Sequence, residues 1–258
     1  PLLGEFVNKE FYETPSAGRE KFTSPLGADK FSHHLPLVEN KAAVWIDVPN
    51  DSGVGSENRN SNKSRFRSAE VLCATKLLEK WMKSDSEKKL TFGVISFYSA
   101  QCEEILKELK DAGITEFNKK NGLYEICDEF KDTAQNEKGE TKERLRIGTV
   151  DAFQGMEFDA VILCAVRSAS EGRIKNAEKA VNPDEILKKQ QGLFGFLMSK
   201  NRLCVSMSRQ KKILAVTGDK NLFTSDVAKE AVPELAHFYD LCKNNKEYGL
   251  ILKSEDLK

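Results

Sequence analysis

The stretch LRIGTVDAFQGMEFDAVILCAV (145–166) contains two apolar runs of strand length, LRIGTV (145–150) and AVILCAV (160–166), joined by a polar connection. Continuous apolar runs of this length are typical of strands that are buried on both faces of a sheet. The chain contains three more such runs: AVWIDV (43–48), FGVISF (92–97) and ILAVTGD (213–219). We therefore predict buried strands at these five places.

Helical patterns separate the predicted strands. Ser99 can cap a helix that ends near Ala112, because Gly113 suits a C-cap position. Two further helices are expected, one over Asp184–Lys189 after Asn182-Pro183 and one over Pro233–Lys243. The segment Ala69–Lys83 carries the stripe of an amphipathic helix, formed by Val71, Leu72, Thr75, Leu78 and Met82.

Strands that alternate with amphipathic helices indicate an α/β fold with a mainly parallel sheet covered on both faces. Residues 1–63 hold most of the prolines, so we expect a loop-rich N-terminal arm of the same domain that residues 64–258 form. Residues 114–143 are charged and weakly periodic, and 136–143 is typical of an exposed loop.

The composition narrows the class of protein. Forty basic and forty acidic residues give a formal charge of zero, so nucleic-acid binding would need a local basic patch. No apolar run approaches the ~18 residues of a membrane span, and the N-terminal residues do not resemble a signal peptide. The six widely spaced cysteines are typical of free thiols in a reducing, cytoplasmic compartment, and the three histidines lack partners at zinc-ligand spacing.

The polar connection TVDAFQGMEFD (149–159) is the first candidate site. It gathers Asp151, Gln154, Gly155 and Glu157 after a predicted strand. In open α/β sheets, ligands bind in the crevice outside the carboxyl ends of the strands. The alternative is a polar turn in which Gly155 supplies a positive φ angle.

The second candidate is the basic segment GFLMSKNRLCVSMSRQKK (195–212), which is helical in pattern and leads into the strand at 213–219. Arginine suits bidentate binding of phosphate and stabilises the charge that develops during phosphoryl transfer. The alternatives are a solvated basic face and, for Arg209, a structural salt bridge.

Three blocks together resemble a known family: FGVISFYSAQ (92–101), TVDAFQGMEFDAVILCAVRS (149–168) and GFLMSKNRLCVSMSRQK (195–211). Their order, spacing and content are similar to the C-terminal signature blocks of superfamily 1 helicases, in particular the group of the nonsense-mediated-decay RNA helicase. FVNKEFYE (6–13) and SRFRSAEV (64–71) resemble weaker upstream blocks. The resemblance implies a RecA-like, P-loop NTPase-type three-layer αβα fold.

The resemblance also implies that the chain is the second motor domain of a longer helicase. The sequence contains no GxxxxGK[ST] phosphate loop and no accompanying acidic magnesium-binding block, both of which belong to the first motor domain. Pro1 matches a position shortly after a tyrosine–arginine–methionine–histidine block of the family. ATP and Mg²⁺ would be bound mainly by the first RecA-like domain of the same chain, single-stranded DNA or RNA would be the partner, and the isolated fragment would be inactive.

The family's motifs imply a role for each matching residue. Arg209 would be the arginine finger at the γ-phosphate, and we expect its guanidinium at the carboxyl-end cleft of the sheet. Glu157 would contact the ribose or the phosphates, with Gln154 and Gly155 shaping the same wall. The other implied positions are Gln101 and Glu70 on the nucleotide side, and Thr149, Asp151 and Arg202, which couple that site to the nucleic-acid backbone.

Several positions depart from the family pattern. In the last block, Cys204 stands where the family usually has asparagine, and Ser208 stands where it has threonine. Lys211 keeps the positive charge of its position but lacks the guanidinium fork of an arginine. Arg67 stands where the upstream block often has asparagine. The segment Ser168–Leu193 is longer than in the decay helicase and has no implied role. Two other readings stay open: a non-catalytic nucleic-acid-binding or protein-docking module with a retained helicase fold, and a helicase–nuclease fusion.

Overall fold

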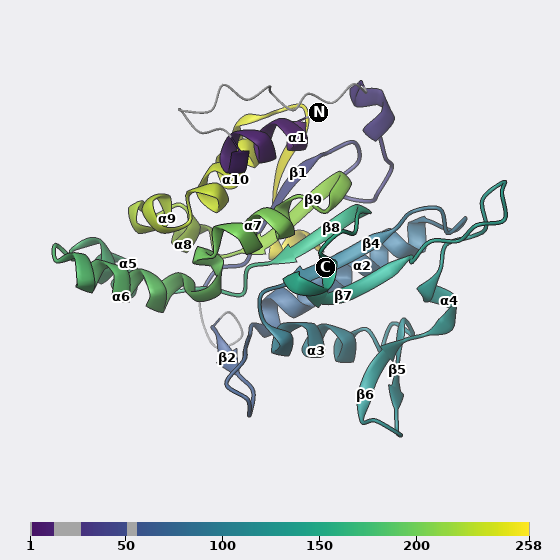
Figure 1. Cartoon of the computed structure of the whole chain (residues 1–258), viewed down its shortest axis with the longest axis horizontal. Helices are drawn as coiled ribbons and strands as arrows, with labels where there is room; N and C mark the ends of the chain where they lie inside the picture. The colour runs from purple at the N-terminus through teal and green to yellow at the C-terminus, as the bar shows by residue number, and fades with distance from the viewer. Residues whose placement is uncertain (1, 13–26, 51–55, 258) are drawn as a thin grey trace.

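A six-stranded sheet forms the centre of the protein in the computed structural model, which describes residues 2–12, 27–50 and 56–257 (Figure 1). Pro1 and the parts of the predicted arm at 13–26 and 51–55 lie outside the described residues. The strand order is β10-β1-β9-β8-β4-β7, and every pairing is parallel. The strands are β1 (Ala43–Asp47), β4 (Phe92–Ser96), β7 (Leu145–Thr149), β8 (Phe158–Cys164), β9 (Gln210–Gly218) and β10 (Gly249–Lys253).

Helices flank this sheet and complete a RecA-like three-layer αβα fold. Helices α2 (Ser68–Ser84) and α3 (Ser99–Glu108) pack together, α2 against β8 and β9 and α3 against β4 and β7. Helix α10 (Pro233–Asn244) packs against β1 and β10, and α1 (Leu2–Val7) contacts α10 through the rings of Phe6 and Phe238. The shorter helices are α4 (Asp128–Lys131), α5 (Glu171–Glu178), α6 (Pro183–Phe194), α7 (Lys200–Met207), α8 (Lys220–Phe223) and α9 (Asp226–Ala231), with a π-helical turn η1 (Asn8–Tyr12) and 3₁₀ turns η2 (Ala28–Phe31), η4 (Val150–Phe153), η5 (Gly195–Met198) and η6 (Ser254–Leu257).

All five predicted strands lie in the sheet, and β1 has a central place in it. Strand β1 pairs with β9 on one side and β10 on the other, and all of its residues are buried. Trp45 makes edge-to-face contacts with Phe223 and Tyr239, at ring distances of 5.6 and 5.5 Å. A segment from the predicted arm therefore forms part of the hydrophobic core.

Four features were not predicted from the sequence. The edge strand β10 extends the sheet beside β1, and helix α5 pairs with α6, which is longer than the expected 184–189 segment. An antiparallel hairpin, β5 (Thr115–Asn118) and β6 (Leu123–Ile126), interrupts the expected loop at 114–143, and a second small ribbon pairs β2 (Asn58–Arg59) with β3 (Arg65–Phe66). Figure 1 shows the α5–α6 pair and the β5–β6 hairpin projecting from opposite ends of the molecule.

Helix α3 differs from its prediction at both ends. Tyr98 occupies the N-cap position, and Ser99 is the first helical residue, with its hydroxyl 3.3 Å from that of Ser64. The helix ends at Glu108 because the next turn closes with i→i+3 bonds, from Lys110 N to Lys107 O and from Asp111 N to Glu108 O. Gly113 then takes a φ of +72°, as a residue that ends a helix often does.

All six cysteines are free thiols, as predicted, and Cys73, Cys102, Cys164 and Cys242 are buried. Burial raises the pKa of Cys73 and of Cys102 to about 12, so both thiols stay protonated and pack as small apolar side chains. Within the described residues, no helix combines the length and apolar character needed to cross a membrane.

A buried ion pair between Arg67 and Glu70 connects the carboxyl ends of several strands. Both side chains are completely buried, and Arg67 Nη1 lies 2.6 Å from Glu70 Oε1. Glu70 Oε2 accepts hydrogen bonds from Val166 N at 3.0 Å, just after β8, and from Thr217 Oγ1 at 2.8 Å, in β9.

The same arginine reaches two further elements. Arg67 Nη2 donates to Val48 O at 2.8 Å, just after β1, and the backbone N–H of Arg67 donates to Gln101 Oε1 at 2.9 Å, in α3. Burial raises the pKa of the Glu70 carboxyl, and Arg67 opposes that shift by stabilising the carboxylate. The pair thus ties β1, β8, β9, α2 and α3 together.

We predict that Arg67→Met lowers the free energy of unfolding by about 3–5 kcal/mol, because it leaves the Glu70 carboxylate buried without a counter-charge. Lys83→Met is the matched control, since it removes a cation from an exposed pair with Glu79 on the same helix and should change the stability little. Urea unfolding of both variants measures the difference. Equal stabilities for the two variants would contradict a structural role for the buried pair.

Candidate functional site

The predicted site residues other than Glu70 and Gln101 lie at two opposite edges of the sheet. Strands β8 and β9 are parallel, and their first residues, Phe158 and Gln210, are paired in register. Glu157 and Arg209 directly precede these residues, so both lie at the amino-terminal edge. The expected position of Arg209 at the carboxyl-end cleft is therefore wrong.

The guanidinium of Arg209 is half-buried beside the segment Gly155–Glu157. Its Nη1 donates to Met156 O at 3.1 Å, its Nε to Val205 O at 3.0 Å and its Nη2 to Ser208 Oγ at 2.7 Å. All three acceptors are uncharged. A guanidinium has five N–H groups, so these bonds to the described residues leave two donors for a ligand.

Gly155 and Glu157 form the wall next to Arg209. Gly155 has a φ of +78°, and a Cβ there would meet no atom within 4 Å, so the turn needs glycine for its backbone conformation alone. The Glu157 side chain is 62% exposed, with Oε2 3.6 Å from Lys211 Nζ, and Gln154 is exposed. A groove of about 780 Å³ opens beside this wall, lined by Gly155, Glu157, Lys211 and residues that include Lys89, Thr91, Asp159 and part of the 133–143 loop.

The predicted coupling residues lie at the carboxyl-terminal edge. Thr149 is the last residue of β7, and Asp151 follows in η4. Arg202 of α7 forms an ion pair with Asp151 and places its Nε 3.3 Å from Asp151 Oδ1. The structure therefore brings Asp151 and Arg202 together, and Thr149 lies two residues away.

Two chain segments connect the two edges, one over residues 151–156 and the other over α7 and its continuation to Arg209. They contact each other at the Asp151–Arg202 ion pair and again at the bond from Arg209 to Met156 O, with α7 packed on η4 between them. Phe153 anchors the first segment through its buried ring, which packs closely against Gly93. A Cβ added to Gly93 would lie only 2.9 Å from Phe153 Cε1. Packed contacts therefore run continuously from one edge of the sheet to the other.

Glu70 and Gln101 lie elsewhere. Both side chains are completely buried in the network around Arg67, so neither is exposed at either edge. The structure separates these two residues from Arg209 and Glu157 and places them beneath the carboxyl ends of the strands.

Three of the four positions that depart from the family pattern, Cys204, Ser208 and Lys211, lie in the region of Arg209, whereas the fourth, Arg67, lies in the buried network with Glu70. Ser208 accepts a bond from the Arg209 guanidinium, and Lys211 pairs with Glu157. The Cys204 thiol donates to the Tyr12 hydroxyl at 3.6 Å, and this hydrogen bond raises the pKa of Tyr12 while nearby Arg209 opposes the shift. Sequence reasoning missed Tyr12, although it lies in the block FVNKEFYE.

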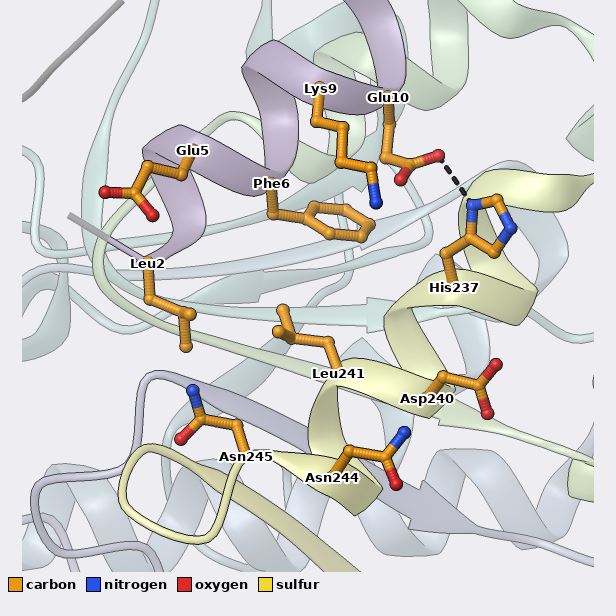
Figure 2. A pocket seen from close by; sticks show the side chains of 10 residues that line it. All are labelled: Leu2, Glu5, Phe6, Lys9, Glu10, His237, Asp240, Leu241, Asn244 and Asn245. Carbon is orange, nitrogen blue, oxygen red and sulfur yellow. Dashed lines mark hydrogen bonds and ion pairs between the residues drawn. The ribbon is translucent and has the colours of Figure 1, made fainter.

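Another pocket, of about 550 Å³, lies between α1, η1 and α10. Figure 2 shows His237 of α10 facing Glu10 of η1, with His237 Nδ1 2.8 Å from Glu10 Oε2. None of the predicted site residues lines it. Among the residues that the structure describes, no group of three His, Cys, Asp or Glu side chains could hold a metal ion.

Comparison with known proteins supplies the family. A family model described as "AAA domain" matches residues 1–221. Similar proteins include the probable helicase senataxin of Mus musculus, 26% identical over 80% of this chain, and the putative helicase MOV-10 of Gallus gallus, 25% identical over 83%. A regulator of nonsense transcripts 1 homolog of Neurospora crassa is 25% identical over 85% of the chain.

The chain spans only a small part of these relatives: 6% of the length of senataxin, 19% of MOV-10 and 16% of the nonsense-transcript regulator. The match to the family model nevertheless covers most of the chain, including every strand of the central sheet except β10 and the segments that carry Glu157 and Arg209. The chain belongs to this AAA domain family and is a superfamily 1 helicase domain of the group that resembles the nonsense-mediated-decay helicase.

Proposed function

We propose that the chain is the second RecA-like motor domain of an ATP-dependent helicase that acts on single-stranded DNA or RNA. The observation that carries the proposal is the environment of Arg209. Its guanidinium is oriented by three uncharged acceptors beside an exposed carboxylate, at one edge of a RecA-like sheet, and keeps donors for a ligand. An arginine oriented in this way suits the role of an arginine finger, which stabilises charge on a transferring phosphoryl group.

The residues at the amino-terminal edge fit part of a nucleotide site. Glu157 offers carboxylate oxygens that can accept hydrogen bonds from ribose hydroxyls, and Gly155 leaves open space beside it. Arg209 and Lys211 supply positive charge for phosphate. The sequence contains no phosphate loop, so ATP and the Mg²⁺ that neutralises its phosphates would be held mainly by a first RecA-like domain.

Coupling to nucleic acid would occur through the opposite edge. Thr149, Asp151 and Arg202 lie there, and the two connected segments run from them to Met156 and Arg209. We propose that these segments change position together when nucleotide binds, which alters the contact with the strand backbone. Such contacts would be independent of sequence and sensitive to salt.

Glu70 and Gln101 receive a different role in this proposal. Since both side chains are buried, we propose that they act through Arg67, by fixing the carboxyl ends of the strands. We further propose that residues 1–63 and 64–258 form a single functional domain, which is supported by the central place of β1 in the sheet.

This chain alone should hydrolyse ATP no faster than buffer, with or without single-stranded nucleic acid, because the groups that normally hold the phosphates are missing. Release of inorganic phosphate measures this directly. Turnover that persists through repurification and disappears in the Arg209→Ala variant would show that a complete site exists here, contrary to the proposal.

In the longer protein, Arg209→Ala should lower kcat for ATP hydrolysis by about 10³–10⁵-fold, because the finger neutralises charge that builds in the transition state. Arg209→Lys should restore little, since an ammonium cannot reproduce the planar fork. Arg59→Ala in β2 is the control, because it removes an exposed arginine from a small ribbon separate from the segments that carry Arg209 and Glu157. Turnover of Arg209→Ala equal to that of the control would support the alternative, a non-catalytic module with a retained helicase fold.

A further inference from the structure

We propose that Phe196, together with Tyr98 and Arg202, forms a platform on which one base of a single-stranded nucleic acid stacks. The inference rests on the proposed function, because it names a contact for the strand that the domain would bind. Neither the motifs quoted above nor the comparisons assign a role to Phe196.

The local fold exposes Phe196 although its neighbours are buried. Phe194 and Leu197 are 0% and 1% exposed, whereas Phe196 between them is 56% exposed. Gly195 has a φ of +53°, and a Cβ on it would lie 2.9 Å from Arg167 Nη1 and 3.0 Å from Tyr98 Oη. A glycine is therefore required where the chain passes Tyr98 and turns Phe196 outward.

The ring of Phe196 rests on fixed groups. Its centroid lies 5.5 Å from that of Tyr98, and the Tyr98 hydroxyl accepts a bond from Arg167 Nη1 at 3.2 Å. The guanidinium carbon of Arg202 lies 5.7 Å from the same ring, and Asp151 holds Arg202 through their ion pair. The platform is thus an exposed aromatic ring with an aromatic and a cationic neighbour, all held in place by buried or paired groups.

The position and charge of the platform favour a nucleic acid as its occupant. Tyr98 lies at the end of β4 and Asp151 shortly after β7, so the platform lies at the carboxyl-terminal edge, opposite Arg209. Arg202 and Lys200 place two cationic groups at the same helix start, with side chains 33% and 61% exposed, and each is also paired with a carboxylate, that of Asp151 and of Glu234. Bases stack on aromatic rings whatever their sequence, and nearby cations attract the phosphates between them.

The test measures the affinity of this chain at low salt for fluorescein-labelled oligouridine, oligothymidine and an abasic deoxyribose oligomer of equal length. Phe196→Ala should weaken binding to the two base-containing strands by roughly 5- to 100-fold and leave binding to the abasic strand unchanged. The dependence of affinity on salt should also stay the same, because stacking releases no counterions. Phe196→Trp should retain the affinity and Phe196→Leu should lose it.

Phe117→Ala is the matched control, because Phe117 is a 46% exposed aromatic on the separate β5–β6 hairpin and should not affect any strand. An equal loss for abasic and base-containing strands, or a changed salt dependence, would overturn the platform and assign Phe196 a structural role in placing Arg202. An unchanged affinity in Phe196→Ala would also overturn it and leave the proposed function intact. Failure of the unaltered chain to bind any strand would contradict both the platform and the nucleic-acid part of the proposed function.

Discussion

The buried ion pair between Arg67 and Glu70 is the interaction on which the geometry of this domain depends. Taking two charges out of water is costly, and the cost is offset only when each charge finds several partners. Here Arg67 bonds to the chain after β1 and Glu70 to β9 and to Val166 after β8. Val166 has a φ of +67°, which is unusual for a β-branched residue, and Glu70 holds it there by accepting its N–H.

The backbone conformation at Val166 affects the position of groups at the surface of the carboxyl-terminal edge. Directly after Val166, the buried Arg167 bonds to the Tyr98 hydroxyl and to Gly192 O, and its Nε lies 3.1 Å from Glu57 Oε1. These contacts fix Tyr98 and the end of α6, and hence the start of the segment that carries Phe196, Arg202 and Arg209. The contacts of Arg67, Glu70 and Arg167 form one continuous buried set, and this set positions the segments at both edges of the sheet.

The sequence was sufficient to predict the buried strands and the family, but it misled on details that depend on tertiary contacts. The spacing predicts that Leu72 lies on the apolar stripe of α2, yet its side chain is 38% exposed, while the charged Glu70 is completely buried. A periodic pattern cannot show that a carboxylate will find Arg67, Val166 and Thr217 inside the protein. The sequence pattern does not predict β10, because a short edge strand carries a weak pattern and is defined by its pairing with β1.

The position of Arg209 could have been predicted from chain order, since a residue that precedes a parallel strand lies at its amino end. The rule that ligands bind at the carboxyl ends of strands in open α/β sheets does not apply to a residue at that position. Tyr12 was missed for another reason. Its neighbour Cys204 is 192 positions away in the sequence, so only the folded chain brings the two together.

The most direct test of this account is a structure of the longer protein with ADP and aluminium fluoride, which mimics the γ-phosphoryl group during transfer. We predict that the guanidinium of Arg209 contacts the fluoride atoms while Glu157 reaches the ribose or the phosphates. A complex in which Arg209 only keeps its present bonds to Val205, Met156 and Ser208, with other groups alone on the fluoride, would contradict the account.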